Sequence, residues 1–160
     1  MQNTYAIGID VGGTNTDMGL VRDDAKIVSR RSIPTTNYTD FHLYVKDIMA
    51  QIESMIAEGD AEKGVKSIAL DELTGIGMGA PNGNFYTGCV ECAPNLPMKG
   101  LLEFEKEFGK YTKIPVVLSN GKVEQTKDLG IVAEKPGYEV AAVNVQSKPG
   151  RIRSLLWTKW

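Results

Sequence analysis

Near its N-terminus the chain reads Tyr5-Ala-Ile-Gly-Ile-Asp-Val-Gly-Gly-Thr-Asn15, an apolar run that stops at a cluster of turn residues. A short apolar run bounded by glycines is typical of a buried strand followed by a tight turn. Asp10 ends the run, and Gly12, Gly13 and Thr14 suit a turn whose backbone N–H groups approach a phosphate. Asp10 would then orient a magnesium ion through water, since hard cations prefer oxygen ligands. The alternative is a plain hairpin turn that joins two strands.

Two further strands are predicted directly after this turn. Residues 18–21 are apolar, residues 26–33 are extended in character, and residues 22–25 form a second turn between them. Links this short require antiparallel pairing, because parallel strands need a crossover of about a dozen residues or more. Pro34 ends the predicted three-stranded meander.

A helical period replaces the strand pattern after Pro34. Apolar side chains recur at three-, four- and seven-residue spacings between Phe41 and Ile56, which predicts one amphipathic helix that packs on the sheet. Thr39 or Asp40 is the expected N-cap of this helix, and Gly59 is its expected end.

The rest of the first 120 residues alternates between extended and helical patterns. Residues 67–70 and 74–80 are predicted as the next extended stretch, followed by an Asn-Gly turn and a small hairpin over residues 85–90. Residues 101–108 show a shorter helical stripe, and residues 114–118 read as a buried strand. The predicted fold is α/β, with an antiparallel meander followed by βαβ units in a mixed sheet with helices.

Three other motifs are predicted to be structural. Gly75-x-Gly77-x-x-Ala80 matches the spacing of a dinucleotide fingerprint, but a turn follows it where that fingerprint requires a helix. We therefore interpret its glycines as one face of a strand. Cys89 and Cys92 form a single C-x-x-C pair, too few ligands for zinc, so no zinc or other metal site is expected there. His42, the one histidine, is expected to be a solvated helix residue.

The composition is that of an ordinary globular protein. The 160 residues are 42% hydrophobic and 24% charged, and no apolar run reaches the roughly 20 residues of a membrane span. No secretion signal is visible at the start, so a cytoplasmic location without membrane contact is expected. Residues 1–120 carry 11 Lys and Arg against 16 Asp and Glu, a net charge of −5 that disfavours nucleic acid as a partner. Residues 121–160 carry 7 against 4, a net charge of +3, and include both tryptophans.

Four segments, in this order, are similar to one known family. They are Ile7-Gly-Ile-Asp-Val-Gly-Gly-Thr-Asn-Thr16, Gly77-Met-Gly-Ala-Pro-Asn-Gly83, Ala93-Pro-Asn-Leu-Pro97 and Pro115-Val-Val-Leu-Ser-Asn120. On these motifs the chain resembles the N-terminal lobe of the repressor, open-reading-frame, kinase (ROK) family of sugar kinases, and within it the bacterial glucokinases. The resemblance covers residues 5–120 and implies an actin-like, ribonuclease-H-like ATPase lobe.

The resemblance also implies a reaction and a site. In such kinases ATP and a hexose meet in a cleft between two lobes, and the sugar 6-hydroxyl attacks the γ-phosphate. ATP with Mg²⁺ would be held at a first phosphate loop formed by Asp10, Gly12, Gly13 and Thr14. Asn95 and Asn120 would contact hydroxyls of the hexose, with glucose the expected sugar. An intact member of the family can also form a homo-oligomer.

The match with the family breaks directly after Asn120. The family has its catalytic aspartate at the next position, and this chain has Gly121, which can neither accept a proton nor orient a hydroxyl. No catalytic residue is therefore assigned. Met98 also stands where the related glucokinases usually carry tryptophan. This difference from the family bears on how tightly the chain is expected to bind a sugar.

Charge, tryptophan usage and motif content all change at the same place. We therefore expect residues 1–120 to be the kinase lobe and residues 121–160 to be a non-family tail, produced by a frameshift, a misjoined junction or a truncated gene. The alternative is a divergent native tail in which residues 140–145 form a strand that completes the sheet.

Three functions remain open at this stage. The first is an ATP-dependent hexose kinase lobe that is inactive, or nearly so, by itself. The second is a non-catalytic module that binds a sugar or a nucleotide. The third, a fragment of a ROK-type transcriptional repressor, ranks last because a repressor needs an N-terminal helix-turn-helix and this sequence opens on its first strand.

Overall fold

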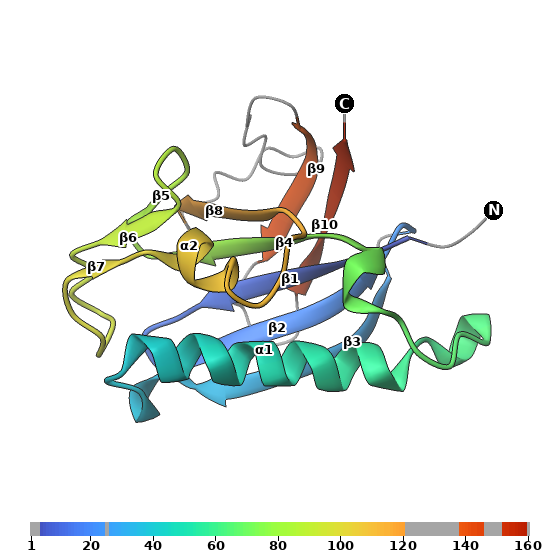
Figure 1. The fold of residues 1–160 in the computed structure, drawn as a ribbon, viewed down its shortest axis with the longest axis horizontal. Coiled ribbons are helices and arrows are strands. Elements are labelled where there is room, and N and C mark those ends of the chain that lie inside the picture. The colour runs from blue at the N-terminus through green and yellow to red at the C-terminus, as the bar shows by residue number, and fades with distance from the viewer. Residues whose placement is uncertain (1–3, 25, 121–137, 146–151, 160) are drawn as a thin grey trace.

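The computed structural model describes residues 4–24, 26–120, 138–145 and 152–159, and Figure 1 shows its fold. The strands are β1 (Tyr5–Val11), β2 (Asn15–Arg22), β3 (Ile27–Pro34), β4 (Leu73–Ala80), β5 (Gly83–Asn84), β6 (Cys89–Glu91), β7 (Leu101–Leu102), β8 (Val116–Asn120), β9 (Tyr138–Val145) and β10 (Ile152–Lys159). The helices are α1 (Phe41–Glu58) and α2 (Phe104–Phe108), with 3₁₀ turns η1 (Thr35–Asn37), η2 (Ala61–Lys63) and η3 (Leu70–Glu72). No helix within these ranges is long and apolar enough to cross a membrane.

The body of the protein is a five-stranded sheet with the order β3-β2-β1-β4-β8. β1, β2 and β3 pair antiparallel, as predicted for strands joined by short turns. β4 runs parallel to β1 and β8 runs parallel to β4, because the chain crosses over through α1 and then through α2 before each return. The predicted mixed α/β sheet, a meander followed by βαβ units, is confirmed.

α1 lies along the sheet, as Figure 1 shows, and its buried apolar side chains belong to the same core as the sheet. Ile48 and Ile52 of the helix are fully buried in the same core cluster as Ile7 and Ile9 of β1. The alternation of side chains along a strand puts both β1 residues on one face. The apolar patterns of α1 and β1 therefore both contribute to one core.

Both ends of α1 lie where they were predicted. The Asp40 carboxylate caps the helix by accepting hydrogen bonds from the N–H groups of His42 (2.8 Å) and Leu43 (3.1 Å). Gly59 follows the last helical residue with a φ of +67°, and a Cβ at this position would lie 2.2 Å from the carbonyl oxygen of Val65. Glycine is thus required at the end of α1, both for its backbone conformation and for the close approach of the next segment.

The extended stretch predicted from residue 67 is shorter in the structure. Residues 67–69 are not part of a strand, and residues 70–72 form the 3₁₀ turn η3. The Glu72 carboxylate accepts a hydrogen bond from the N–H of Ala69 at 2.8 Å, which fixes this turn. β4 therefore begins only at Leu73.

The helix predicted over residues 101–108 was wrong in its first turn. Leu101 and Leu102 form β7, which pairs with β6 so that buried Leu102 lies opposite buried Val90. Only Phe104–Phe108 is helical. The two leucines extended the apolar period of the helix by chance, and pairing with β6 determined their conformation instead.

The small hairpin exists and its second strand, β6, contains Cys89 and Val90 as predicted, but its first strand is β5 and not residues 85–87. β5 pairs with β6, and residues 85–88 form the turn between them. The Asn84 side-chain oxygen accepts hydrogen bonds from the N–H groups of Tyr86 (2.9 Å) and Thr87 (3.3 Å). This local bonding holds the turn and explains why the aromatic residues 85 and 86 are not in a strand.

A buried ion pair secures the start of β1 and the end of β2. Arg22 donates to Asp60 at 2.8 Å, and both side chains are 2% exposed. The Tyr5 hydroxyl donates to the same carboxylate at 3.1 Å, and Arg22 also donates to Asp24 at 2.7 Å. Burial alone would raise the pKa of Asp60, but the hydrogen bonds from Arg22 and Tyr5 hold it below its ordinary value. The hydrogen bond from Arg22 lowers the pKa of Asp24 to about 2.

β9 and β10 pair antiparallel in a two-stranded sheet of their own. Residues 140–145 are therefore in a strand, but this strand does not pair with the five-stranded sheet as the alternative prediction required. Gly121 and the rest of residues 121–137 lie outside the described residues. The origin of the tail stays a prediction.

Candidate functional site

The carboxyl ends of β1, β4 and β8 meet at one edge of the sheet, and their arrows in Figure 1 point to the same side of the molecule. In the strand register Asp10 lies beside Gly79, and Ala80 lies beside Asn120. Ligands of open α/β sheets bind outside the carboxyl ends of the parallel strands. We call this part of the protein the carboxyl edge and take it as the candidate site.

The glycine-rich turn joins β1 to β2 at the carboxyl edge. The Gly12 N–H donates to the carbonyl oxygen of Asn15 at 3.0 Å and closes the turn. A Cβ at Gly12 would lie 2.6 Å from that oxygen, so a turn of this shape needs glycine. Gly12 and Gly13 are half-buried and Thr14 is exposed, so a ligand can reach the turn. The turn does connect a hairpin, and its phosphate-binding role stays a prediction.

The loop that carries Asn95 lies against this turn. A Cβ at Gly13 would be 2.8 Å from the carbonyl oxygen of Asn95, so only glycine allows the two backbones to approach this closely. The loop is held by a hydrogen bond from the Leu96 N–H to Ala93 (3.2 Å) and by the ammonium group of Lys99, which donates to the Leu96 carbonyl oxygen (2.8 Å). The Asn95 side chain itself is exposed.

Met98, where the resemblance leads one to expect tryptophan, is 2% exposed. Its side chain therefore anchors the Asn95 loop in the core. Methionine in place of tryptophan at residue 98 would therefore affect ligand binding only through the position of this loop.

The start of β5, which follows the turn after β4, packs on the end of β8. A Cβ at Gly83 would lie 2.4 Å from the carbonyl oxygen of Ser119, the residue before Asn120. The backbone of Asn120 pairs with Ala80 as the last residue of β8. The fold thus brings Asp10, the glycine-rich turn, the Asn95 loop and the backbone of Asn120 to one edge, although they are spread over 110 residues of sequence.

Asp10 offers oxygen ligands at the carboxyl edge. It is half-buried near the end of β1, and Asp17 of β2 lies directly opposite it in the register. Like charges in such a pair repel each other, and a cation between or beside them relieves the repulsion. Carboxylate oxygens suit a hydrated Mg²⁺, so this pair fits the expected ion. Among the described residues there is no group of three or more His, Cys, Asp or Glu side chains that could hold a metal directly.

Three buried hydroxyls lie behind the glycine-rich turn, and sequence reasoning missed them as a group. Thr16 Oγ1 lies 2.5 Å from the Tyr44 hydroxyl oxygen and 2.7 Å from Thr35 Oγ1. Burial raises the pKa of Tyr44 above its ordinary value, and the charge of Asp10 adds to the shift. One signal was available: Thr16 alternates with two apolar residues of β2, Met18 and Leu20, so a polar side chain stands on a core-facing row.

The cysteines and the histidine do not come to this site as a ligand set. Cys89 is half-buried, Cys92 is exposed, and both are free thiols. His42 is on the first turn of α1, where its Nδ1 lies 2.9 Å from a carboxylate oxygen of Glu107 in α2. Burial would raise the pKa of Glu107, but hydrogen bonds from Lys110 and His42 keep it below its ordinary value. This cluster links the two helices.

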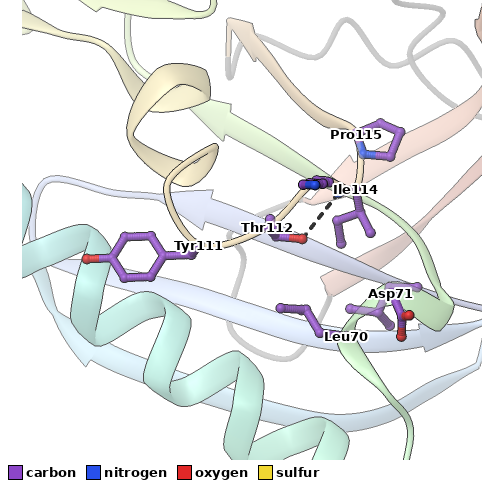
Figure 2. Close-up of a pocket in the computed structure, with 8 residues that line it drawn as sticks. Leu70, Asp71, Tyr111, Thr112, Ile114 and Pro115 are labelled. Atoms are coloured by element: carbon purple, nitrogen blue, oxygen red, sulfur yellow. Dashed lines mark hydrogen bonds between the residues drawn. The ribbon is translucent and has the colours of Figure 1, made fainter.

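An open pocket lies at the opposite end of the parallel strands, where β4 and β8 begin. Figure 2 shows its lining, which comes from Leu70, Asp71 and Leu73 and from residues 111–115. Thr112 Oγ1 accepts a hydrogen bond from the Ile114 N–H at 3.2 Å and shapes this wall. None of the predicted site residues lines the pocket, so it is separate from the carboxyl edge.

Comparison with known proteins supports a fold shared with sugar kinases. A glucokinase of Halalkalibacterium halodurans is 29% identical over 126 residues, which are 75% of this chain and 34% of that enzyme. A ROK family glucokinase from Streptomyces griseus, solved with glucose and AMPPNP, is 23% identical with a TM-score of 0.56 and covers 72% of this chain and 33% of its own. No protein-family profile matches the chain.

The same fold also occurs in a regulator. A ROK family transcriptional regulator, a homologue of the E. coli MLC protein, is 20% identical with a TM-score of 0.56 and covers 72% of this chain and 27% of its own. The chain therefore spans about a third of the length of these relatives. The comparisons confirm the expected resemblance to the N-terminal part of ROK sugar kinases and the expected fold class.

Proposed function

From this resemblance to the N-terminal part of ROK sugar kinases, we propose that the chain is the nucleotide- and sugar-binding lobe of an ATP-dependent hexose kinase of the cytoplasm, with glucose as its sugar. The observation that carries the proposal is the contact between Gly13 and the Asn95 loop, which joins the predicted phosphate loop to the predicted sugar loop. Phosphoryl transfer depends mainly on positioning and on neutralising charge, so a site that joins these two loops suits it.

The glycine-rich turn would hold the phosphates. Backbone N–H groups at Gly13 and Thr14 would donate to phosphate oxygens, since glycines without side chains let a phosphate approach the backbone. Asp10, opposite Asp17, would hold the water shell of Mg²⁺. Mg-ATP, when bound, supplies the phosphoryl group and the cation that neutralises it.

The asparagines would hold the sugar. A side-chain amide has both a donor and an acceptor, so Asn95 and Asn120 can each bond a pair of neighbouring hydroxyls. Asn95 is exposed on a loop that the core fixes through Leu96 and Met98. An amide on a fixed loop loses little conformational entropy on binding.

The chain by itself would not turn over efficiently. Gly121 stands where the family has its general base, and the loss of a positioned base costs about 10²- to 10⁴-fold in rate. We place the kinase lobe in residues 1–120 and regard residues 121–160 as non-family sequence. Translation of the other two reading frames from codon 121 tests the frameshift version. It is wrong if neither frame yields an aspartate at this position followed by a glycine-rich segment.

A second candidate is a non-catalytic module that binds sugar or nucleotide. The absence of a carboxylate at residue 121 and the shared fold of a ROK transcriptional regulator favour it. Both candidates require ligand binding at the carboxyl edge. They differ only in whether the reaction proceeds.

Calorimetry and a coupled ADP-release assay test these proposals together. We expect the 160-residue chain to bind glucose, Asn95→Ala to weaken this binding at least tenfold, and Asn37→Ala, a change of another exposed asparagine, to leave it unchanged. Turnover near that of an intact glucokinase would overturn the claim that Gly121 abolishes catalysis. No binding of either glucose or Mg-ATP would reject both candidates.

A further inference from the structure

We propose that the hydroxyls of Thr16, Thr35 and Tyr44, here called the hydroxyl cluster, position the glycine-rich turn for phosphate binding; this inference rests on the proposed function. The three side chains are 0% exposed, and Thr16 stands at the centre with contacts of 2.5 Å to Tyr44 and 2.7 Å to Thr35. These are positioning residues, because they act through the turn and not on a ligand.

The cluster joins three elements at the base of the turn. Thr16 lies opposite Val11 in the register, and this pair is the last one before the turn itself. Thr35 opens η1, directly after the end of β3. Tyr44 lies in the first turn and a half of α1. The hydroxyl cluster therefore fixes the turn to the helix and to the edge strand at once.

The chemistry of buried hydroxyls makes this junction specific. A buried hydroxyl without a partner costs free energy, so each member holds the others in a narrow range of positions. Thr16 precedes Asp17, which pairs with Asp10 in the strand register, so the cluster lies next to the predicted cation ligand. A shift of Thr16 would move the end of the β1–β2 hairpin, where Asp10 and the glycine-rich turn lie.

The packing role of Tyr44 can be separated from its hydroxyl. Its ring contacts the rings of Tyr38 (centroids 5.2 Å apart) and Phe104 (6.3 Å), and Tyr44→Phe keeps both ring contacts. Tyr38→Phe is a matched control, because the Tyr38 hydroxyl donates to Asp47 on α1 at 2.8 Å and not to the turn. Both changes remove one hydroxyl oxygen from neighbouring rings, but only Tyr44→Phe removes a hydrogen-bond partner of Thr16.

The first measurement needs no ligand. Amide hydrogen exchange reports the opening of the hydrogen bond from the Gly12 N–H to the Asn15 carbonyl oxygen. The Ile68 N–H, which donates to Ile56 in the last turns of α1, is far along the sequence from the cluster and serves as the internal reference. We expect Tyr44→Phe to speed exchange at Gly12 about tenfold, which corresponds to about 1.4 kcal/mol, with no change at Ile68. Thr16→Val, which also removes a hydroxyl, should speed exchange at Gly12 to a similar extent. Thr16→Ser, which keeps the hydroxyl, should exchange as slowly as the wild type.

The second measurement is the affinity for Mg-AMPPNP by calorimetry. We expect Tyr44→Phe to weaken binding about tenfold and Tyr38→Phe to leave it unchanged. Unchanged exchange at Gly12 in Tyr44→Phe, or equal acceleration at Gly12 and Ile68, would overturn the positioning role whatever the ligand does. If Tyr44→Phe speeds exchange at Gly12 but binds Mg-AMPPNP as tightly as the wild type, the cluster does not influence phosphate binding. A third outcome is that Tyr44→Phe speeds exchange at Gly12 while the wild-type chain binds no Mg-AMPPNP. This result would reject the proposed function but would support the role of the cluster in positioning the turn.

Discussion

Replacing Gly13 with alanine probes the contact on which the candidate site depends. The backbone of Gly13 does not have a positive φ, so alanine is compatible with its conformation and the effect is purely steric. The new Cβ would lie 2.8 Å from the carbonyl oxygen of Asn95, about 0.6 Å short of the 3.4 Å at which ordinary contact begins. Because the opposing atom belongs to the backbone, the whole Asn95 loop must move.

The cost of this movement can be bounded. Forcing an extra methyl group into a well-packed contact costs about 1–3 kcal/mol. A domain of this size loses roughly 2–4 °C in Tm for each kcal/mol, so we expect a fall of several degrees. We also expect the affinity for glucose to fall, since Asn95 would no longer lie at its position beside the turn.

Urea unfolding followed by fluorescence, with glucose calorimetry on the same samples, measures both effects. Gly109→Ala is the matched control, because its Cβ would lie 3.2 Å from the carbonyl oxygen of Lys106, only about 0.2 Å short of ordinary contact, and its φ is −60°. If Gly13→Ala were as stable as the wild type and bound glucose equally well, the close approach of the Asn95 loop would not constrain the site. The reasoning from the glycine contact would then be refuted.

Three further predictions concern the core, the charges and the cation. Phe104→Ala should destabilise the fold by about 3–5 kcal/mol in urea unfolding, because its fully buried ring is in edge contact with Phe41. The pKa of Asp24 is about 2, and that of Asp60 is also lowered, so the stability they contribute is complete above about pH 4 and is lost as the pH falls toward 2. An acid titration followed by circular dichroism should show this loss of stability. Arg22→Met should make the stability less dependent on pH in this range, because the variant lacks the guanidinium group that lowers both pKa values. Removal of Mg²⁺ with EDTA should weaken AMPPNP binding at least tenfold in calorimetry, and equal affinity with and without the ion would exclude a cation role for Asp10.

The elements with a clear period could be predicted from the sequence. β1, residues 18–21 of β2 and α1 have clear apolar patterns, and β3 follows a turn and ends at Pro34. The Asp40 cap and Gly59 mark the ends of α1 through local interactions. Leu101 and Leu102 could not be assigned correctly, because a helical spacing to Phe104 competed with their pairing to β6, and the sequence does not reveal that pairing. Tertiary contacts override local pattern in short segments.

The candidate site was predictable in its residues but not in its arrangement. The motif around Asp10 named the turn, and the resemblance to a kinase lobe named Asn95. Their contact depends on a backbone approach between segments some 80 residues apart, which no local signal encodes. The hydroxyl cluster is of the same kind, since Thr16, Thr35 and Tyr44 meet only after the sheet and α1 have packed.

The claim that the glycine-rich turn binds phosphate is tested most directly by titrating the isotope-labelled chain with Mg-AMPPNP and following backbone amide resonances. We expect the largest shifts at Gly12, Gly13 and Thr14, with smaller shifts at Asn95, whose backbone lies against Gly13. Shifts confined to residues 111–115, which line the pocket at the other end of the parallel strands, or no shifts at all, would contradict it.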